Sequence, residues 1–445
     1  MIKTTPVQEK TPVISTPAIF KNMDERFLHY VWRFQQFDAG NLFSTSNEAV
    51  SIYHPGTLNH NSGPDFSEAR LRIGPMEWAG QVEIHLRSSD WLRHGHQSDA
   101  AYHNVVLHVV YEHDKTISNL DGSPIPTLEL KDRIHSDQFE KYHRLRHDAA
   151  GIPCTSNIQR VPEIIRTATI DRMVMERLEQ KTKEVVDGLK TDLHDWEAAT
   201  MHLLARSLGM KTNAHTFGEF ANSVPWNKLS RHHDFQKEAL IFGLAGFLDD
   251  QPQDEHQQAL QKEFVFLKHK LGLTQKVSRH HWKFSKLRPP NFPTVRLSQL
   301  LAILQKESRL FSKLIGATSI KEVEACLQVP LSNYWSNHYD FAKGSKKVIG
   351  PIGKTTLDSI VINAVVPLLV AYGRAIDEQS LIEKAISWLE KMGPENNVIT
   401  RKWDEIGLEN QSALQSQGLI QLYKNYCSRR RCLQCGIGNK ILNMA

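Results

Sequence analysis

Alternation of apolar and polar residues marks two strands near the start of the chain. In Ala69–Ile73 and Gln81–Arg87 the apolar residues fall on every second position, as in strands with one buried face. The turn dipeptide Gly74-Pro75 lies between them and predicts a hairpin. Val105–Tyr111 is apolar almost throughout, which is typical of an interior strand covered on both faces.

Other short elements surround these three strands. A helical period marks residues 24–37, and the stretch 91–102 reads as a loop with a short helix. Further strands are expected at 49–53 and 127–130, and a linking helix at 142–148. Together they predict an α/β domain with a mixed sheet over residues 21–150, preceded by a flexible, Pro- and Thr-rich tail over residues 1–20.

Beyond residue 151 the pattern becomes helical. Amphipathic helices are expected over residues 162–190, 195–209, 234–248, 256–271, 295–315, 319–328, 355–373, 378–391 and 411–426. No fixed period relates them, so an all-α domain over residues 151–410 is expected rather than a solenoid. Residues 411–445 then form a C-terminal helix and a cysteine-bearing segment.

The composition narrows the class of protein. The 445 residues are 40% apolar and 23% charged, which excludes wholesale disorder. No apolar run reaches the roughly 18 residues that span a bilayer, and the N-terminal stretch lacks the apolar core of a secretory signal. We therefore expect a cytoplasmic protein without a membrane partner. The net charge of +5 permits a nucleic-acid partner without requiring one.

The residues with the strongest chemical signal lie between Asp65 and Asp99. Asp65 stands at the start of one predicted strand, and Glu83 and His85 share a face of the next. The hairpin at Gly74-Pro75 brings Asp65 near Glu83. Two carboxylates and a backbone carbonyl, that of Ile84, suit Mg²⁺ or Mn²⁺, which prefer oxygen ligands.

This arrangement resembles the PD-(D/E)XK nuclease superfamily. Pro64-Asp65 and Glu83-Ile84-His85 match its motif, except that His85 stands where the family has lysine. The resemblance implies that Asp65 and Glu83 hold the metal and that His85 orients or activates water. A lysine supplies a permanent charge there, whereas a histidine does so only when protonated and otherwise acts as a base or ligand.

Three further residues match supporting positions of the same superfamily. Glu25, in the predicted first helix, resembles an acidic residue that some members carry there. Tyr102 resembles the Gln/Tyr motif of the RecB-like branch, and Gln97 is one residue out of register with it. The resemblance covers about 100 residues and implies a nucleic-acid substrate.

A second resemblance covers nearly the whole chain. The segments GPDF (63–66), VEIH (82–85), SSDW (88–91) and HGH (94–96) are similar to those of an uncharacterised bacterial family of unknown function. This likeness supplies no activity.

Two other interpretations of the same region remain open. His94 and His96, with Asp99 and His85, have the residue types of a transition-metal site, as in a cupin-like triad, although the predicted strands are too few for a barrel. Alternatively, Asp65 caps a turn, and Glu83 and His85 belong to a solvated strand face.

Three cysteines near the C-terminus have metal-ligand spacing. Cys427, Cys432 and Cys435 form a C-x4-C-x2-C pattern, which suits Zn²⁺ or an iron–sulfur cluster with a fourth ligand. The layout resembles RecB-like nucleases in which one distant cysteine joins a C-terminal trio, and this likeness implies Cys154. Arg429, Arg430 and Arg431 lie within the pattern and are candidate phosphate contacts.

The leading functional hypothesis is a metal-dependent phosphodiesterase that cleaves nucleic acid. Its alternative is a catalytically inactive, nuclease-like platform that binds nucleic acid or a protein partner.

Overall fold

The computed structural model describes residues 23–59, 62–119, 122–134, 136–147, 151–189 and 195–444. The flexible tail expected over residues 1–20 lies outside this range.

The chain divides into two compact units, each described by itself. Unit 1 combines residues 1–169 with residues 423–445, and unit 2 comprises residues 170–422. The N-terminal part expected over residues 21–150 falls in unit 1. The cysteine-bearing end of the segment expected over residues 411–445 belongs to unit 1 as well, whereas its helix lies in unit 2.

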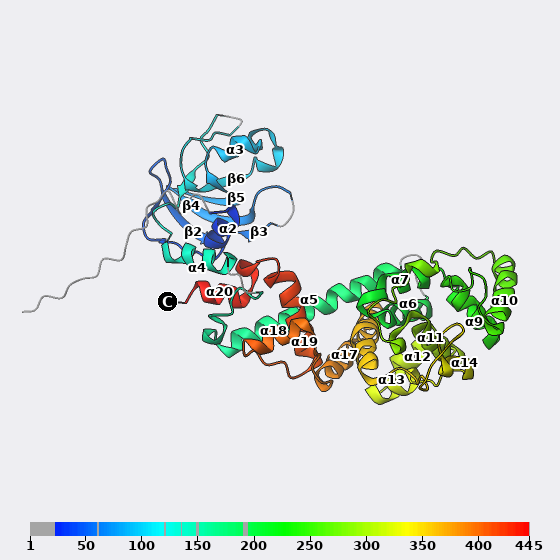
Figure 1. The fold of residues 1–445 in the computed structure, drawn as a ribbon. Helices are drawn as coiled ribbons and strands as arrows, with labels where there is room; N and C mark the ends of the chain where they lie inside the picture. Colours follow the sequence, from blue (N-terminus) through cyan, green and yellow to red (C-terminus); the bar gives the residue numbers. More distant parts are fainter. Residues whose placement is uncertain are drawn as a thin grey trace, which may run out of the picture. The chain divides into compact units, whose positions relative to one another are not determined.

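Unit 1 contains a mixed sheet with the strand order β1-β2-β4-β5-β6-β7, and β3 pairs with β4 (Figure 1). The strands are β1 (Leu42–Phe43), β2 (Ala49–His54), β3 (Thr57–Leu58), β4 (Phe66–Ile73), β5 (Met76–Arg87), β6 (Val105–Glu112) and β7 (Thr127–Glu129). β5 pairs antiparallel with β4 and parallel with β6, which in turn pairs parallel with β7. The expected mixed sheet is confirmed.

The predicted hairpin joins β4 to β5. Ile73 pairs with Met76 across the two-residue turn, where Gly74 has a φ of +57°, a conformation that glycine adopts without strain. The apolar residues of β4 are buried in alternation, as the sequence pattern predicts. The interior position of β6 is also confirmed, since its Val109 and Val110 are fully buried between two neighbouring strands.

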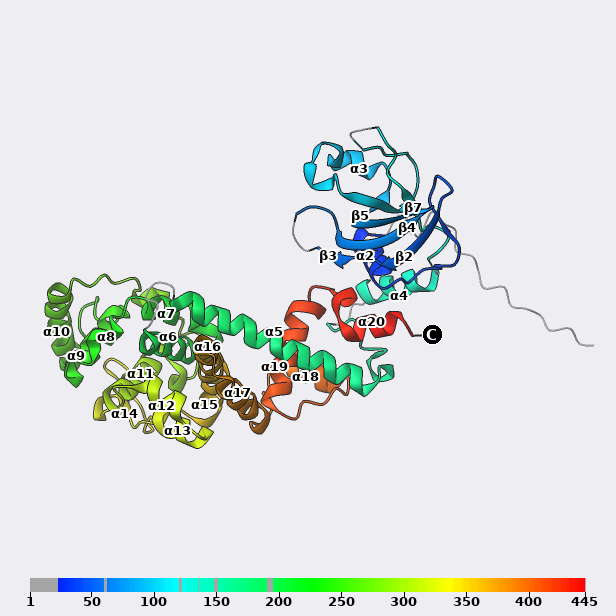
Figure 2. The same ribbon diagram turned by 180° about the vertical axis from the view of Figure 1, so that it is seen from behind.

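Helix α2 (Glu25–Arg33) packs against the sheet and contacts β5 (Figure 2). The side chain of Asp24 caps its first turn by accepting a hydrogen bond from the N–H of Phe27 at 3.1 Å. The helix ends four residues before the predicted Phe37. Gln35 has a φ of +52°, and this left-handed residue turns the chain out of the helix.

The C-terminal segment of the chain packs within unit 1. Helix α20 (Gly436–Leu442) lies beside α4 (Ser136–His147) in both ribbon views. The hydroxyl of Tyr30 donates to Asn443 Oδ1 at 3.3 Å, and Lys141 Nζ donates to the carbonyl of Met444. Segments from the two ends of the chain therefore pack together in unit 1.

Unit 2 is helical. Its longer helices are α5 (Glu163–Leu189, which begins in unit 1), α6 (Trp196–Leu208), α7 (Met210–Ala221), α9 (Asp234–Leu244), α10 (Glu255–Leu271), α11 (Pro293–Lys306), α13 (Ile320–Leu327), α16 (Val366–Ala375), α17 (Gln379–Lys391), α18 (Val398–Glu405) and α19 (Ala413–Leu422). The short pieces are α8 (Trp226–Leu229), α12 (Leu310–Gly316), α14 (Asn333–Asn337), α15 (Lys354–Ile360) and the hairpin of β8 (His338–Asp340) and β9 (Lys343–Gly344). One continuous apolar core contains buried residues from these helices except α18.

The helix expected over residues 295–315 is two helices, α11 and α12. Glu307 is extended between them, and the Glu197 carboxylate accepts hydrogen bonds from the N–H groups of Leu310 and Phe311 at 2.8 and 3.1 Å. A carboxylate at this point satisfies the N–H groups of a new first turn. The break therefore depends on a residue more than 100 positions away.

Within the described residues, one helical stretch, Lys354–Ala375, is long and apolar enough to cross a membrane by length and composition. Because 78% of its most apolar window is buried in the structure, it is weak evidence for a span.

Candidate metal centre

Asp65 and Glu83 lie on neighbouring segments where β4 and β5 run side by side, and each carboxylate accepts a hydrogen bond from the backbone of the other segment. The N–H of Asp65 donates to Glu83 Oε2, and the N–H of Ile84 donates to Asp65 Oδ2, both at 3.0 Å. The pairing of Phe66 with Val82 sets this register, because it places the residue before β4 opposite Glu83. The structure thus brings Asp65 and Glu83 together.

Burial and neighbouring carboxylates disfavour the ionised forms of Glu83 and Glu25. Burial raises the pKa of Glu83, which is only 5% exposed, and the nearby Asp65 and Glu25 carboxylates raise it further. The pKa of Glu25, on α2, is raised by burial and by Asp65, while His94 opposes the shift. A cation bound beside Glu83 would favour its ionised form, as at a metal site.

His85 is enclosed by other histidines. Its Nδ1 lies 2.9 Å from His108 Nε2, its Nε2 lies 3.1 Å from His94 Nδ1, and its side chain is 1% exposed. Burial and the neighbouring imidazoles lower the pKa of His85 to about 2. A neutral imidazole suits metal binding or proton acceptance, but it lacks the permanent charge of a lysine.

Three histidines form a possible metal-ligand set. One nitrogen from each of His85, His94 and His96 lies within 4.8 Å of the other two. Glu83 Oε1 lies 3.2 Å from His96 Nε2 and 3.6 Å from His85 Nε2. Three imidazoles next to a carboxylate are typical ligands of Zn²⁺, Mn²⁺ or Fe²⁺. Asp99 instead caps a turn, since its side chain accepts a hydrogen bond from the N–H of Ala101.

Tyr102 lies in the same cluster. Its ring stacks on His96 with the centroids 3.8 Å apart and the planes 19° apart. Burial, together with Glu83 and Asp65, raises the pKa of Tyr102 to about 12. The side chain of Gln97 is exposed in the 3-10 turn His96–Ser98.

Two residues of the cluster were not predicted. His29 Nε2, on α2, lies 3.1 Å from Asp65 Oδ2. It follows Glu25 by one helical turn, and this i, i+4 spacing in the predicted helix was an available signal. His108 pairs with Glu83 across the parallel strands β5 and β6 and is fully buried. The sequence feature that could have indicated His108 is its place as a histidine inside the apolar run 105–111.

A hydrogen-bonded turn holds the segment that carries His94 and His96. Asp114 Oδ1 accepts from the N–H of Ser89 at 2.8 Å and from the Ser88 hydroxyl at 3.0 Å. The Ser89 hydroxyl donates to Asp114 Oδ2 at 2.7 Å. Helix α3 (Asp90–Arg93) begins directly after these serines, so Asp114 fixes the start of the histidine-bearing turn.

Replacing Asp114 by alanine is expected to lower the melting temperature at neutral pH. Partial burial opposes the shift, but the hydrogen bonds from Ser89 and Ser88 prevail and lower the pKa of Asp114. The ionised Asp114 stabilises the folded state fully at any pH above the ordinary carboxyl pKa. This contribution is lost as the pH falls through the lowered pKa of Asp114 in the folded protein. Because the carboxylate is exposed, the expected loss is about 1 kcal/mol.

Thermal unfolding measured between pH 7 and pH 2 tests this prediction. The difference between wild type and Asp114→Ala should shrink in acid, whereas Asp132→Ala, at an exposed aspartate of the same unit, should change little. A difference that is constant with pH would show that the ionised carboxylate contributes nothing.

The four candidate cysteines and the arginine run also lie in unit 1. Cys154, Cys427, Cys432 and Cys435 are between 6% and 8% exposed. Arg429 and Arg431 are exposed, and Arg430, with a φ of +52°, is half-buried.

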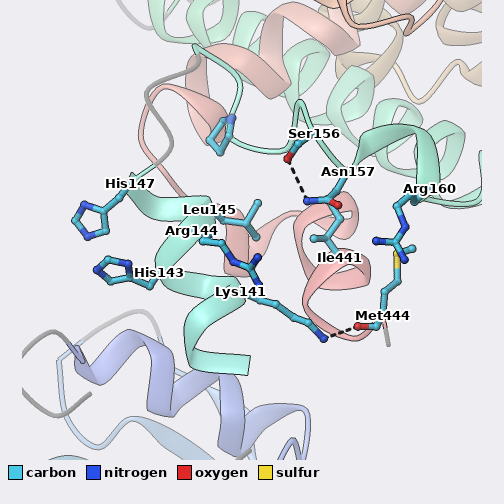
Figure 3. A pocket seen from close by; sticks show the side chains of 11 residues that line it. Lys141, His143, Arg144, Leu145, His147, Ser156, Asn157, Arg160, Ile441 and Met444 are labelled. Atoms are coloured by element: carbon cyan, nitrogen blue, oxygen red, sulfur yellow. Dashed lines mark hydrogen bonds between the residues drawn. The ribbon is translucent and has the colours of Figure 1, made fainter. Parts of the chain in front are cut away.

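A basic pocket of about 510 Å³ opens between α4, residues 153–160 and the C-terminal segment (Figure 3). Its cationic and imidazole side chains are Lys141, His143, Arg144, His147 and Arg160. A pocket with this lining suits an anion such as phosphate.

The comparison with known families finds a match over most of the chain. A family model described as "Protein of unknown function (DUF2851)" matches residues 25–398. No curated protein and no solved structure matches the chain.

Proposed function

Because the chain belongs to a family of proteins of unknown function (DUF2851), we propose its function from the site: it is a metal-dependent phosphodiesterase that cleaves nucleic acid. The observation that carries this proposal is the contact of Asp65 and Glu83 with each other beside three histidines whose ligand nitrogens lie within 4.8 Å. Carboxylates and imidazoles around one small space are the ligands of hydrolytic metal centres.

The donor set favours a transition metal over Mg²⁺. Magnesium prefers oxygen ligands, whereas imidazole suits Mn²⁺, Fe²⁺ and Zn²⁺. Asp65, Glu83 and the histidines His85, His94 and His96 would hold the ion. Bound there, it would neutralise charge on the scissile phosphate and lower the pKa of a water molecule.

The residues around the ion supply the remaining functions. His29 Nε2 is buried and lies 3.1 Å from Asp65 Oδ2, so this imidazole suits holding the Asp65 carboxylate in position. His85 is fully enclosed and neutral, which suits a ligand better than the lysine-like role implied by the PD-(D/E)XK resemblance. Tyr102 closes one side of the cluster by stacking on His96.

Several features support nucleic acid as the substrate. The PD-(D/E)XK resemblance implies an α-β-β-β-α-β core, and α2, β2, β4, β5, α3 and β6 follow one another in this order. The basic pocket at Lys141 and Arg144 and the exposed Arg429 and Arg431 belong to the same unit as the site. Such groups bind a phosphate backbone without reading its sequence.

Incubation of the full chain with labelled single- and double-stranded DNA and RNA tests the proposal. Cleavage is expected with Mn²⁺, weaker cleavage with Mg²⁺, and none after chelation by EDTA. If the chain binds these substrates but leaves them intact with Mn²⁺, Mg²⁺, Zn²⁺ and Fe²⁺, the enzyme proposal fails.

That outcome would favour the alternative, a nuclease-like platform that only binds. The burial of Glu83 and His85 supports this binding-only alternative. Their side chains are 5% and 1% exposed, and a closed site admits a phosphate poorly.

A further inference from the structure

The basic pocket of unit 1 is formed by three segments of the chain (Figure 3). Helix α4 contributes Lys141 and Arg144, which are three residues apart and therefore share a face of the helix. The turn at residues 153–160 contributes Arg160, and the C-terminal segment forms the third wall. Permanent cations from two separate segments thus line one hollow of about 510 Å³.

The charge of these cations is only partly neutralised. Lys141 pairs with Asp137 at 3.0 Å, and its Nζ donates to the carbonyl of Met444. Arg144 and Arg160 are exposed, and among the described residues no carboxylate forms an ion pair with either. No acidic residue lines the pocket among the described residues. Two guanidinium groups without a carboxylate partner favour the binding of an anion.

The rest of the lining indicates a ligand larger than a bare anion. Apolar side chains of Leu145, Pro153, Ile441 and Met444 form part of the wall. An inorganic ion would leave this apolar part in water, whereas the sugar and base of a nucleotide would cover it. The volume of the pocket lies within the range of about 300–1,000 Å³ that is usual for small-molecule sites. The pocket therefore suits a ligand with a phosphate at one end and a nucleoside at the other.

The charge and the shape of the pocket favour a terminal phosphate over a phosphate within a strand. A phosphomonoester carries about −1.5 to −2 charges at neutral pH, whereas a backbone phosphate carries one. The middle of a strand needs an open groove that follows its backbone. A hollow with walls from three segments instead receives an end.

We propose that the basic pocket binds the phosphomonoester of a nucleotide, either free or at the end of a nucleic-acid strand. Arg144 and Arg160 hold the phosphate, and the apolar part of the lining contacts the nucleoside. For the strand end, this inference rests on the proposed nuclease function.

Helix α4 also connects the pocket to the candidate metal centre. The hydroxyl of Tyr142 lies 3.3 Å from Asp24 Oδ1, and Arg146 forms an ion pair with the same carboxylate. Asp24 caps α2, the helix that carries Glu25 and His29. A strand end bound on α4 would therefore be held by an element that contacts the helix of the metal centre.

Binding to the full chain in the presence of EDTA tests the proposal, because no metal-dependent cleavage occurs. Fluorescence anisotropy compares a labelled single strand that carries a phosphate at either end with the same strand ending in hydroxyl groups. Calorimetry compares adenosine monophosphate with adenosine and with inorganic phosphate. The phosphorylated strand and the monophosphate are each expected to bind about tenfold more tightly than the ligands that lack the phosphate.

Arg144→Gln and Arg160→Gln should each remove most of this tenfold difference. Both side chains are exposed, so the variants should keep the wild-type melting temperature. Arg72→Gln is the matched control, because Arg72 is an exposed arginine of β4 outside the pocket, and its variant should bind like wild type.

The outcomes separate the sources of the phosphate. If adenosine monophosphate binds through Arg144 but the strand ends are not distinguished, the ligand is a free nucleotide. Inorganic phosphate that binds as tightly as the monophosphate would overturn the nucleotide as ligand. Equal affinities with and without the phosphate, or equal losses in Arg72→Gln and Arg144→Gln, would overturn the pocket.

These results are independent of cleavage. A chain that prefers phosphorylated ends but cuts no substrate would keep the pocket and contradict the nuclease proposal. A chain that cuts nucleic acid but ignores terminal phosphates and nucleotides would keep the nuclease proposal and lose the pocket.

Discussion

Asp65→Ala and Glu83→Ala are each expected to abolish Mn²⁺-dependent cleavage. Each removes a hard ligand from a site where the carboxylates contact each other's strand at 3.0 Å. Loss of metal-based charge neutralisation costs several kcal/mol of transition-state stabilisation, or about a thousandfold in kcat. The measurements are the cleavage rate and Mn²⁺ binding followed by electron paramagnetic resonance.

The matched control is Glu77→Ala, at an exposed carboxylate on the same strand, β5. It should keep the wild-type rate and Mn²⁺ affinity. Asp65→Asn and Glu83→Gln distinguish chemistry from folding, because they keep the size of the side chain and remove its charge. Retained cleavage in either variant, with a folded protein, would remove that carboxylate from the metal centre.

His85→Lys is expected to eliminate both metal binding and cleavage. His85 lies between His108 and His94 with both ring nitrogens within 3.1 Å of theirs. An ammonium group in this enclosed space would repel the ion and lose its own hydration. The expected loss equals that of Asp65→Ala, and the protein should also be less stable to heat.

His103→Lys is the control, since His103 is an exposed histidine of the same segment and its variant should resemble wild type. If instead His85→Lys preserves or increases cleavage, His85 occupies the lysine position of the PD-(D/E)XK pattern and does not bind the metal.

The sheet was predictable because its signals are local. Alternation in residues 69–73 and 81–87, the turn at Gly74-Pro75 and the apolar run at 105–111 each indicate structure without distant contacts. The division of residues 295–315 into α11 and α12 was not predictable, because Glu197 makes it from another helix. Likewise, the sequence pattern predicts α6 but not α7, because the break between them falls at Met210, whose φ of +50° is uncommon outside glycine.

The sequence also indicated which acidic residues meet, since a hairpin fixes which residues face each other. The register of this hairpin places Asp65 opposite Glu83. The histidine cluster was only partly foreseen. The sequence pattern indicates His94 and His96 only as an alternative metal site, and it does not single out His29 or His108. The positions of His29 and His108 depend on how α2 and β6 pack against β5, and local sequence patterns do not predict this packing.

Unit 1 is assembled from two stretches of chain, and this order has a consequence for synthesis. The ribosome synthesises all of residues 170–422 before it reaches residues 423–444. Helix α4 therefore cannot pack against α20 until the helical unit has been synthesised. Residues 170–422 are one continuous stretch of chain, so the helical unit can be expressed from a single gene fragment. The sheet-bearing unit, by contrast, can be produced alone only by joining residues 23–169 to residues 423–444 with a designed linker.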